Sequence, residues 1–202
     1  MRAGIISIPN RNHYLNPLID CLKVNGIESK VFIDYHRQGA FWNYMRMFKE
    51  MLENSEQDEP ILLCTDDVIT TYDFNVRFKN LHKEAKSNLY SFFTRQRHML
   101  KYKDVGYVTK VQKRGWYDQA SVFINQQDLP SKVEKWFEDR GKHIMNKHRQ
   151  KHHDVVIQDY FIDNNIPWTI TVPTYFEHTG VVSSLGHNVG QSILYIGNNE
   201  NI

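Results

Sequence analysis

The residues in this sequence best suited to chemistry are two adjacent aspartates, Asp66 and Asp67. They follow the apolar run 61–64, which has the length of a strand, and Val68 comes directly after them. Two neighbouring carboxylates at the end of a buried strand repel each other and lose hydration, so they need a cation or strong donors nearby. A divalent metal meets that need, and a metal with open positions commonly carries phosphates. The alternative is an aspartate pair that starts a turn and caps the next helix.

A second passage with reactive side chains covers 173–186, after a strand predicted over 168–172. It combines His178 with several hydroxyl side chains and two glycines. Such a loop can place an imidazole on a metal while its backbone N–H groups remain available to a phosphate. A histidine in a loop of this composition is equally compatible with an ordinary surface residue, so the passage alone leaves both interpretations open.

The elements that must position these residues alternate between strands and helices in the first third of the chain. This order is typical of an α/β fold with a parallel sheet, in which ligands bind beyond the carboxyl ends of the strands. Asp66 and Asp67 lie at such an end. Apolar periodicity and turn residues predict strands over 3–8, 30–34 and 61–64, a helix from Asn16-Pro17 to Asn25-Gly26, and a helix over 40–53.

The order changes in the rest of the chain. The run 142–153 is basic and rich in histidine, which indicates a surface helix or a loop. The other predicted elements are a helix over 74–86, an extended segment over 88–94, strands over 106–111 and 119–125 around a turn at 114–115, a helix from 130–131, a helix over 154–164 and the strand over 168–172.

Composition favours one globular domain. The chain has 202 residues, 41% of them hydrophobic, and no run approaches the ~18 apolar residues of a membrane span. The N-terminus shows no signal-peptide pattern. Cys21 and Cys64 both lie in apolar patterns, which predicts buried small side chains rather than a disulfide framework or nucleophiles. We therefore expect a cytoplasmic protein with no membrane segment.

Four passages, in chain order, resemble a small glycosyltransferase of the GT-A type: Ile-Pro-Asn-Arg at 8–11, Thr-Asp-Asp-Val at 65–68, and the segments 154–160 and 178–186. The resemblance implies an α/β fold with a single GT-A-like, Rossmann-related domain over 1–202, whose mostly parallel central sheet is flanked by helices. Residues 1–78 are then the half that binds the nucleotide sugar, and 79–202 the half that binds the acceptor. The implied activity moves a sugar from a nucleotide-diphosphate donor, with UDP-glucose expected, to an acceptor hydroxyl.

The resemblance also implies a metal and a base. Asp67 and His178 correspond to ligands of a divalent ion, Mn²⁺ or Mg²⁺, on the donor diphosphate. The family's acidic motif usually begins with an acid, and Thr65 replaces it here, which leaves Asp66 as a contact to the donor. Asp154 corresponds to the catalytic base, with Asp159 as the second choice. Their alternatives are a helix N-cap and a solvated helix face. The donor-binding candidates are Pro9, Asn10, Arg11, Asp34, Arg37 and Asp66.

A basic insert over 79–114 predicts a separate partner. It holds ten Lys or Arg against two acids, although the formal net charge of the chain is only +2. Cations interleaved with aromatic residues are typical of surfaces that neutralise phosphates and stack on exposed bases. The alternative is half-buried aromatic rings beneath a solvated basic face. The nucleic-acid-binding candidates are Lys79, Lys83, Arg95, Arg97, Lys101, Lys103, Lys110, Lys113 and Arg114, among Tyr90, Phe92, Phe93, Tyr102, Tyr107, Trp116 and Tyr117.

With this insert, the chain also resembles virus-encoded enzymes that glycosylate hydroxymethylated pyrimidines in DNA. That resemblance implies modified DNA as the acceptor and, for a viral protein, the host cytoplasm as its location. Two other interpretations stay open at this point. One is a glycosyltransferase that acts on a glycan or a protein, and the other is a non-catalytic nucleic-acid-binding module.

Overall fold

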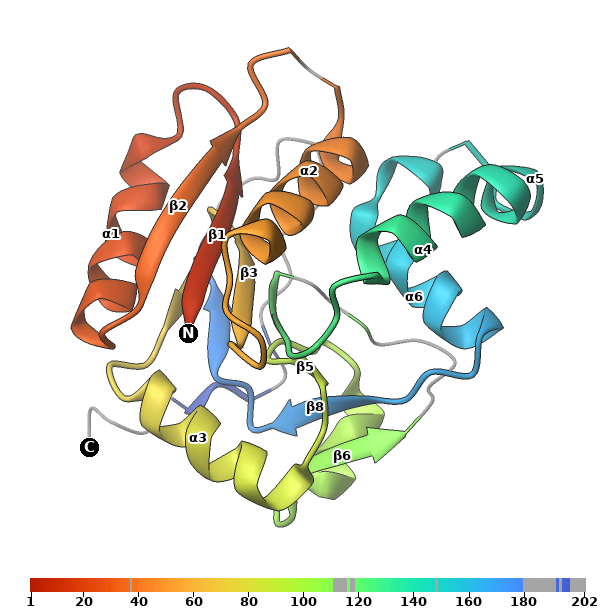
Figure 1. The fold of residues 1–202 in the computed structure, drawn as a ribbon. Coiled ribbons are helices and arrows are strands. Elements are labelled where there is room, and N and C mark those ends of the chain that lie inside the picture. The colour runs from red at the N-terminus through yellow and green to blue at the C-terminus, as the bar shows by residue number, and fades with distance from the viewer. Residues whose placement is uncertain are drawn as a thin grey trace.

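The structure is a computed structural model that describes residues 1–36, 38–110, 116, 119–147, 149–179, 192 and 194–196. Figure 1 shows a sheet with helices on both faces. The α-helices are α1 (Asn12–Val24), α2 (Ala40–Glu53), α3 (Phe74–Ala85), α4 (Leu129–Trp136), α5 (Lys142–Ile144) and α6 (His153–Asp163). The strands are β1 (Arg2–Ser7), β2 (Glu28–Ile33), β3 (Ile61–Thr65), β4 (Val68–Thr70), β5 (Leu89–Ser91), β6 (Gly106–Lys110), β7 (Ala120–Phe123), β8 (Trp168–Val172) and β9 (Phe176–His178). Shorter turns are the 3₁₀ segments η1 (Arg97–Tyr102) and η3 (Arg149–Lys151) and the π-helical η2 (Phe137–Gly141).

The central sheet has seven strands in the order β2-β1-β3-β7-β5-β8-β6. β2, β1, β3, β5 and β8 run in one direction, while β7 and β6 run in the other. The predicted mostly parallel α/β sheet is therefore confirmed. The carboxyl ends of β2, β1 and β3 meet at one edge, which lies toward the top of Figure 1. This is the edge at which ligands bind in open α/β sheets.

Both faces of the sheet are buried, because successive side chains of a strand point to opposite sides. Ile6 packs with residues of α2, α4 and α6 on one face, whereas Ile5 packs with residues of α1 and α3 on the other. Gly4 lets α2 lie close to β1, since a Cβ atom there would be 2.8 Å from Met47 Cγ. Strands buried on both faces are continuously apolar, which is why β1 and β3 could be recognised from the sequence.

The helix predicted to start at Asn16 and Pro17 begins earlier, and that prediction of its start was wrong. α1 begins at Asn12, because the carbonyl of Arg11 accepts hydrogen bonds from the backbone N–H groups of Tyr14 and Leu15. Pro17 thus lies inside the helix. The other end is as predicted, with Asn25 as the C-cap residue and Gly26 at a φ of +67°. The helix over 40–53 is confirmed with the same bounds.

In the second half of the chain, two predicted strands are present but are not paired with each other. The segments predicted as strands around a turn at 114–115 are β6 and β7, but they are not neighbours in the sheet. β6 pairs with β8, and β7 lies between β3 and β5. The turn residues themselves lie outside the described residues. Within the described part of the chain, no helix is long and apolar enough to cross a membrane.

Candidate functional site

Five side chains from four separate segments meet at the carboxyl ends of β1 and β3. They are Ser7, Arg11, Asp66, Asp67 and His178, and we call them the acid–cation cluster. Asp67 and His178, which the sequence proposed as ligands of one ion, lie side by side here, and Arg11, expected only as a contact to the donor, lies next to both acids. Ser7 was not predicted. Its only signal in the sequence is a hydroxyl at the end of an otherwise apolar strand.

The backbone places each member of the acid–cation cluster. Asn10 adopts a left-handed conformation with a φ of +71°, which asparagine tolerates better than most residues and which turns the chain from β1 into Arg11. His178 is in β9, and β9 pairs with β4 so that Val68 lies opposite His178. The prediction of a loop at His178 was therefore wrong.

The contacts within the cluster are ion pairs and hydrogen bonds between nearly buried groups. Ser7 Oγ donates a hydrogen bond of 2.5 Å to Asp66 Oδ2, and Arg11 Nε lies 3.2 Å from the same oxygen. Asp67 Oδ2 lies 3.3 Å from Arg11 Nη2 and 3.3 Å from His178 Nε2. The side chains of the four charged or titratable members expose between 6% and 13% of their surface. One guanidinium thus bridges both acids.

The two acids differ in their pKa. Burial raises the pKa of Asp66, and the negative charge of Asp67 raises it further. The hydrogen bond from Ser7 and the charge of Arg11 act in the opposite direction but do not outweigh burial. Burial also acts to raise the pKa of Asp67, but the hydrogen bond and charge of His178, together with Arg11, outweigh it and lower this pKa to about 2. Asp67 therefore keeps its negative charge at neutral pH, while Asp66 holds a proton more readily. That Asp67 is the better ligand for a cation stays a prediction.

A divalent ion fits this donor set in part. Asp67 Oδ2 and His178 Nε2 are 3.3 Å apart, close to the separation of about 3 Å between adjacent ligands of an octahedral ion with bonds of about 2.1 Å. Among the described residues, no group of three or more His, Cys, Asp and Glu side chains could hold a metal ion. The two side chains therefore suit an ion that takes its other ligands from phosphate and water.

The remaining donor-binding candidates have different surroundings. Pro9 and Asn10 are exposed at the carboxyl end of β1. The carboxylate of Asp34 accepts hydrogen bonds from the backbone N–H groups of Gln38, at 2.9 Å, and Gly39, at 3.0 Å. Asp34 therefore orders the connection from β2 to α2. Arg37 lies outside the described residues.

The two predicted base residues lie on α6. Asp159 accepts hydrogen bonds from Arg149 Nη2 at 2.7 Å on both of its oxygens, so its carboxylate is already engaged by a guanidinium. Asp154 lies in the first turn of α6, where its Oδ1 accepts from the backbone N–H of Val155. Next to it, the ring of His153 stacks on Tyr44 of α2 with a centroid separation of 4.6 Å.

The basic insert contains exposed cations but largely buried rings. Tyr90, Phe92, Phe93 and Trp116 each expose 2% or less, so the expectation that these rings stack on bases was wrong. Tyr90 lies in the core because β5 is a central strand of the sheet, Phe92 packs on Phe74 of α3, and Trp116 packs on Phe161 and Trp168. Of the predicted nucleic-acid-binding residues, Lys79, Lys83, Arg95, Arg97, Lys101 and Lys103 are exposed, Lys110 is half-buried, and Lys113 and Arg114 lie outside the described residues.

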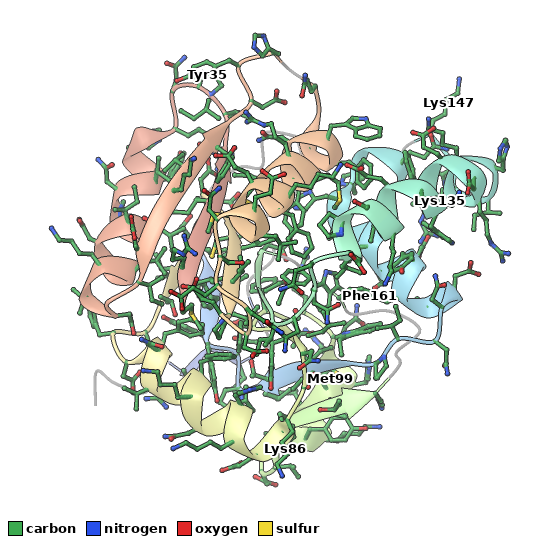
Figure 2. All side chains as sticks on the ribbon, in the orientation of Figure 1. Tyr35, Lys86, Met99, Lys135, Lys147 and Phe161 are labelled. Carbon is green, nitrogen blue, oxygen red and sulfur yellow. The ribbon has the colours of Figure 1, made fainter. Side chains whose placement is uncertain are left out.

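The cations on α3 and β6 lie away from the acid–cation cluster. Figure 1 shows α3, which carries Lys79 and Lys83, and β6 at the lower end of the molecule. Figure 2 shows Lys86 at this lower end, and Tyr35, which follows β2, at the upper end. Lys101 and Lys110 both lie near the ring of Tyr102, at 5.0 and 5.1 Å from its centroid.

Comparisons with known proteins identify the fold. No family model matches the sequence, and no curated protein matches it either. The structure is similar to residues 1–349 of TarS from S. aureus, with a TM-score of 0.54, 11% identity, and coverage of 87% of this chain and 60% of that one. It is also similar to the glycosyltransferase GlyE from Streptococcus pneumoniae TIGR4 (TM-score 0.47, 10% identity, 81% of this chain and 43% of that one). A third similar structure is the galactosyltransferase LgtC in complex with donor and acceptor sugar analogues (TM-score 0.44, 13% identity, 80% and 70%).

Of these three structures, TarS has a TM-score above 0.5, and its similarity supports the fold. The chain has the GT-A-like glycosyltransferase fold that the sequence predicted. It spans 43% of the GlyE chain and 60% of the TarS chain. At 10 to 13% identity these similarities concern the fold, so activity and substrates are proposals.

Proposed function

We propose that this protein is a glycosyltransferase that moves a sugar from a nucleotide-diphosphate donor to an acceptor hydroxyl. The observation that carries the proposal is the acid–cation cluster at the carboxyl ends of the parallel strands β1 and β3. A GT-A-like fold binds ligands at this edge, and the cluster places there a nearly buried guanidinium, an imidazole and two acids.

The chemistry requires that the charge of the departing nucleotide diphosphate be compensated as the bond to the sugar breaks. Arg11 is held in position by both acids, and a fixed cation needs little reorganisation when a phosphate oxygen approaches it. Pro9 and Asn10, which are exposed next to Arg11, are proposed to contact the nucleoside. Asp66, bonded by Ser7 and Arg11, is proposed to orient Arg11.

The proposed activity includes a divalent ion, Mn²⁺ or Mg²⁺, held by Asp67 and His178. Such an ion, when bound, would place two further positive charges against the diphosphate, in addition to the charge of Arg11. Asp67 suits this role because its pKa of about 2 keeps the carboxylate charged at neutral pH.

The acceptor hydroxyl must lose a proton, and a carboxylate within hydrogen-bond reach can take it, as in inverting transferases. We assign this role to Asp154 rather than Asp159, because Asp159 is already hydrogen-bonded to Arg149 through both of its oxygens. Asp154 lies at the start of α6, beside the stacked pair His153 and Tyr44 that joins α6 to α2.

The acceptor has two candidates, a glycan and a hydroxymethylated pyrimidine in DNA. The DNA acceptor is supported by the exposed cations Lys79, Lys83, Arg95, Arg97, Lys101 and Lys103. The position of α3 and β6 at the other end of the molecule weighs against it, as do the buried rings between the cations. A glycan acceptor does not need these residues.

The experiment that tests sugar transfer offers a panel of nucleotide sugars, with UDP-glucose first, to the wild type and to Asp67→Ala. The acceptors are free oligosaccharides and hydroxymethylated DNA, and the products are analysed by mass. We expect release of nucleotide diphosphate and a mass increase of one hexose on one acceptor with the wild type alone. If the wild type neither binds nor consumes any nucleotide sugar, the proposal is wrong.

A further inference from the structure

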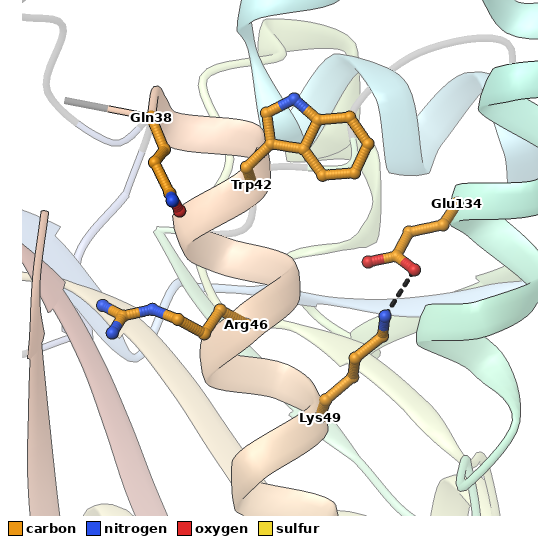
Figure 3. A pocket seen from close by; sticks show the side chains of 5 residues that line it. All are labelled: Gln38, Trp42, Arg46, Lys49 and Glu134. Carbon is orange, nitrogen blue, oxygen red and sulfur yellow. Dashed lines mark hydrogen bonds and ion pairs between the residues drawn. The ribbon is translucent and has the colours of Figure 1, made fainter. Parts of the chain in front are cut away.

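A groove crosses the outer face of α2 and is not part of the acid–cation cluster. It has a volume of about 610 Å³ and is lined by Gln38, Trp42, Arg46, Lys49 and Glu134. Figure 3 shows that the groove extends from Gln38 and Arg46 on one side of α2 to the ion pair of Lys49 with Glu134 of α4 on the other. This volume lies within the range of about 300–1,000 Å³ that small-molecule sites occupy.

Trp42 is the apolar surface of this groove. Its side chain is 40% exposed, whereas Phe41, Tyr44 and Phe48 of the same helix expose 2% or less. The indole is nevertheless held in place, because it contacts Phe41 and the ring of Phe137 edge-to-face, with centroids 4.9 and 6.3 Å away. A large aromatic ring that is fixed at its edge and open on the groove is a preformed stacking surface.

The polar side chains of the groove are also fixed. Arg46 Nη2 donates to Asn43 Oδ1 at 2.6 Å and to the carbonyl of Ile33 at 3.2 Å. Lys49 donates to Glu134, which connects α2 to α4 across the groove. Because these contacts hold the side chains before any ligand arrives, less conformational entropy is lost on binding.

The polar groups indicate the chemistry of the ligand. Arg46 and Lys49 donate hydrogen bonds, Glu134 accepts them, and Gln38 does both. A phosphate only accepts, and Glu134 would repel it. A saccharide hydroxyl both donates and accepts, and the C–H face of a pyranose ring can stack on an indole. The mixed lining therefore suits a neutral sugar better than a nucleotide or a DNA backbone.

We infer that this groove binds a neutral saccharide, with a pyranose ring stacked on Trp42 and its hydroxyls hydrogen-bonded to Lys49 and Glu134, which lie on the same side of α2 as Trp42 (Figure 3). Arg46 is bonded to Ile33, the last residue of β2, so the groove adjoins the sheet edge that carries the acid–cation cluster. The saccharide is then part of the acceptor, which makes the acceptor a glycan; this last step rests on the proposed function, whereas binding itself does not.

The chain offers a direct probe of the groove. Of its four tryptophans, Trp42 is 40% exposed, while Trp116, Trp136 and Trp168 expose 8% or less. Quenching of tryptophan fluorescence by iodide therefore reports mainly on Trp42, and Trp42→Phe should remove most of the quenchable signal. We expect glucose, galactose, N-acetylglucosamine or their disaccharides, at concentrations well above a millimolar Kd, to protect the wild type from iodide without any nucleotide present.

Variants connect that protection to the groove. Calorimetric affinity for the protecting saccharide should fall by about tenfold in Trp42→Ala and in Glu134→Gln, which lose the stacking surface and the charged acceptor. Tyr72→Ala is the matched control, since Tyr72 is a 69% exposed aromatic residue outside the groove, and it should bind as the wild type does. Circular dichroism checks that each variant is folded.

Protection by none of the saccharides overturns the inference. Protection by UDP or by a hydroxymethylated DNA duplex instead of a saccharide also overturns it, because the groove would then take a phosphate-bearing ligand. Saccharide protection without any nucleotide binding would contradict sugar transfer and support the groove. Nucleotide binding without saccharide protection would support sugar transfer and contradict the groove.

Discussion

Strands β1 and β3 carry ion pairs at both of their ends, and the two pairs differ in kind. At the amino end, Arg2 donates two hydrogen bonds to Glu59 Oε2, at 2.7 and 3.0 Å. At the carboxyl end, Arg11 lies 3.2 and 3.3 Å from two different acids. The side chains of Arg2 and Glu59 are 29% and 18% exposed, whereas those of Arg11 and Asp66 are 11% and 6% exposed.

The difference is the one expected if the amino-end pair serves stability and the carboxyl-end cluster serves the proposed binding of a diphosphate. The amino-end pair has short contacts between one positive and one negative side chain, as expected for a surface ion pair that holds the amino ends of β1 and β3 together. The ion pairs of the carboxyl-end cluster are longer, although its acids have lost more of their hydration. Hydrogen bonds at catalytic sites are often long before the ligand arrives and shorten when it binds, so the longer contacts are compatible with a binding site. The predictions below test this comparison.

The largest difference should appear in activity. Asp67→Asn keeps the shape of the side chain but removes its charge, so we expect sugar transfer to fall by about 10²- to 10³-fold. Glu59→Gln makes the same kind of change at the amino end and should leave transfer unchanged. The measurement is the rate of nucleotide diphosphate release with a saturating donor. Equal rates in the two variants would contradict the distinction between the two ends.

Stability should also distinguish the two arginines. Arg11→Gln leaves two nearly buried acids without their guanidinium, and we expect the free energy of unfolding to fall by about 3 kcal/mol. Arg2→Gln breaks a more exposed pair and should cost about 1 kcal/mol or less. Urea unfolding measures both values. A larger loss in Arg2→Gln than in Arg11→Gln would reverse the comparison.

The amino-end pair should depend on pH. The hydrogen bond from Arg2 lowers the pKa of Glu59 in the folded state against a smaller effect of burial. A carboxyl whose pKa is lower in the folded than in the unfolded protein stabilises the fold above its unfolded pKa, and this stabilisation is lost as the pH falls through the folded pKa. Wild type and Glu59→Gln should thus differ by up to about 1 kcal/mol at pH 7 and converge in acid. Urea unfolding between neutral and acidic pH measures this, and a difference that grows in acid would be the wrong sign.

The smallest expected effect concerns the basic insert. If its cations contact DNA phosphates, the slope of log affinity against log salt should become less steep by about 0.9 for each of Lys79→Ala and Lys83→Ala. Lys132→Ala on α4 is the control, because Lys132 is also exposed but lies outside the insert. Fluorescence anisotropy of a labelled duplex gives the slopes. Equal slopes in all variants would make the insert an ordinary solvated face.

The sequence predicted the part of the fold that depends on local patterns. The buried strands β1 and β3 are continuous apolar runs, and the contacts of α2 repeat every three to four residues, so both could be read directly. The alternation of strands and helices then predicted a parallel sheet, with Asp66 and Asp67 at the edge where its strands end and ligands bind. Tyr90 and Phe92 were misjudged because burial on a central strand depends on β7 and β8, which lie far away in the chain.

The parts of the site that escaped prediction depend on distant pairing. β4 and β9 are three-residue strands, and Val68 and His178 are separated by more than half of the chain. Nothing near either residue shows that they pair. The bridging position of Arg11 follows from the left-handed turn at Asn10, and the contact that holds Trp42 comes from Phe137 of η2, far away in the chain. Each of these features requires tertiary structure.

The central claim is that the acid–cation cluster binds the diphosphate of a nucleotide sugar. Calorimetric titration of UDP in the presence of Mn²⁺ tests it most directly, with the wild type, Asp67→Ala and the amino-end control Glu59→Gln. We predict binding to the wild type and to Glu59→Gln, and no measurable binding to a folded Asp67→Ala. Equal binding to all three proteins, or no binding of UDP or any other nucleoside diphosphate to the wild type, would contradict the claim.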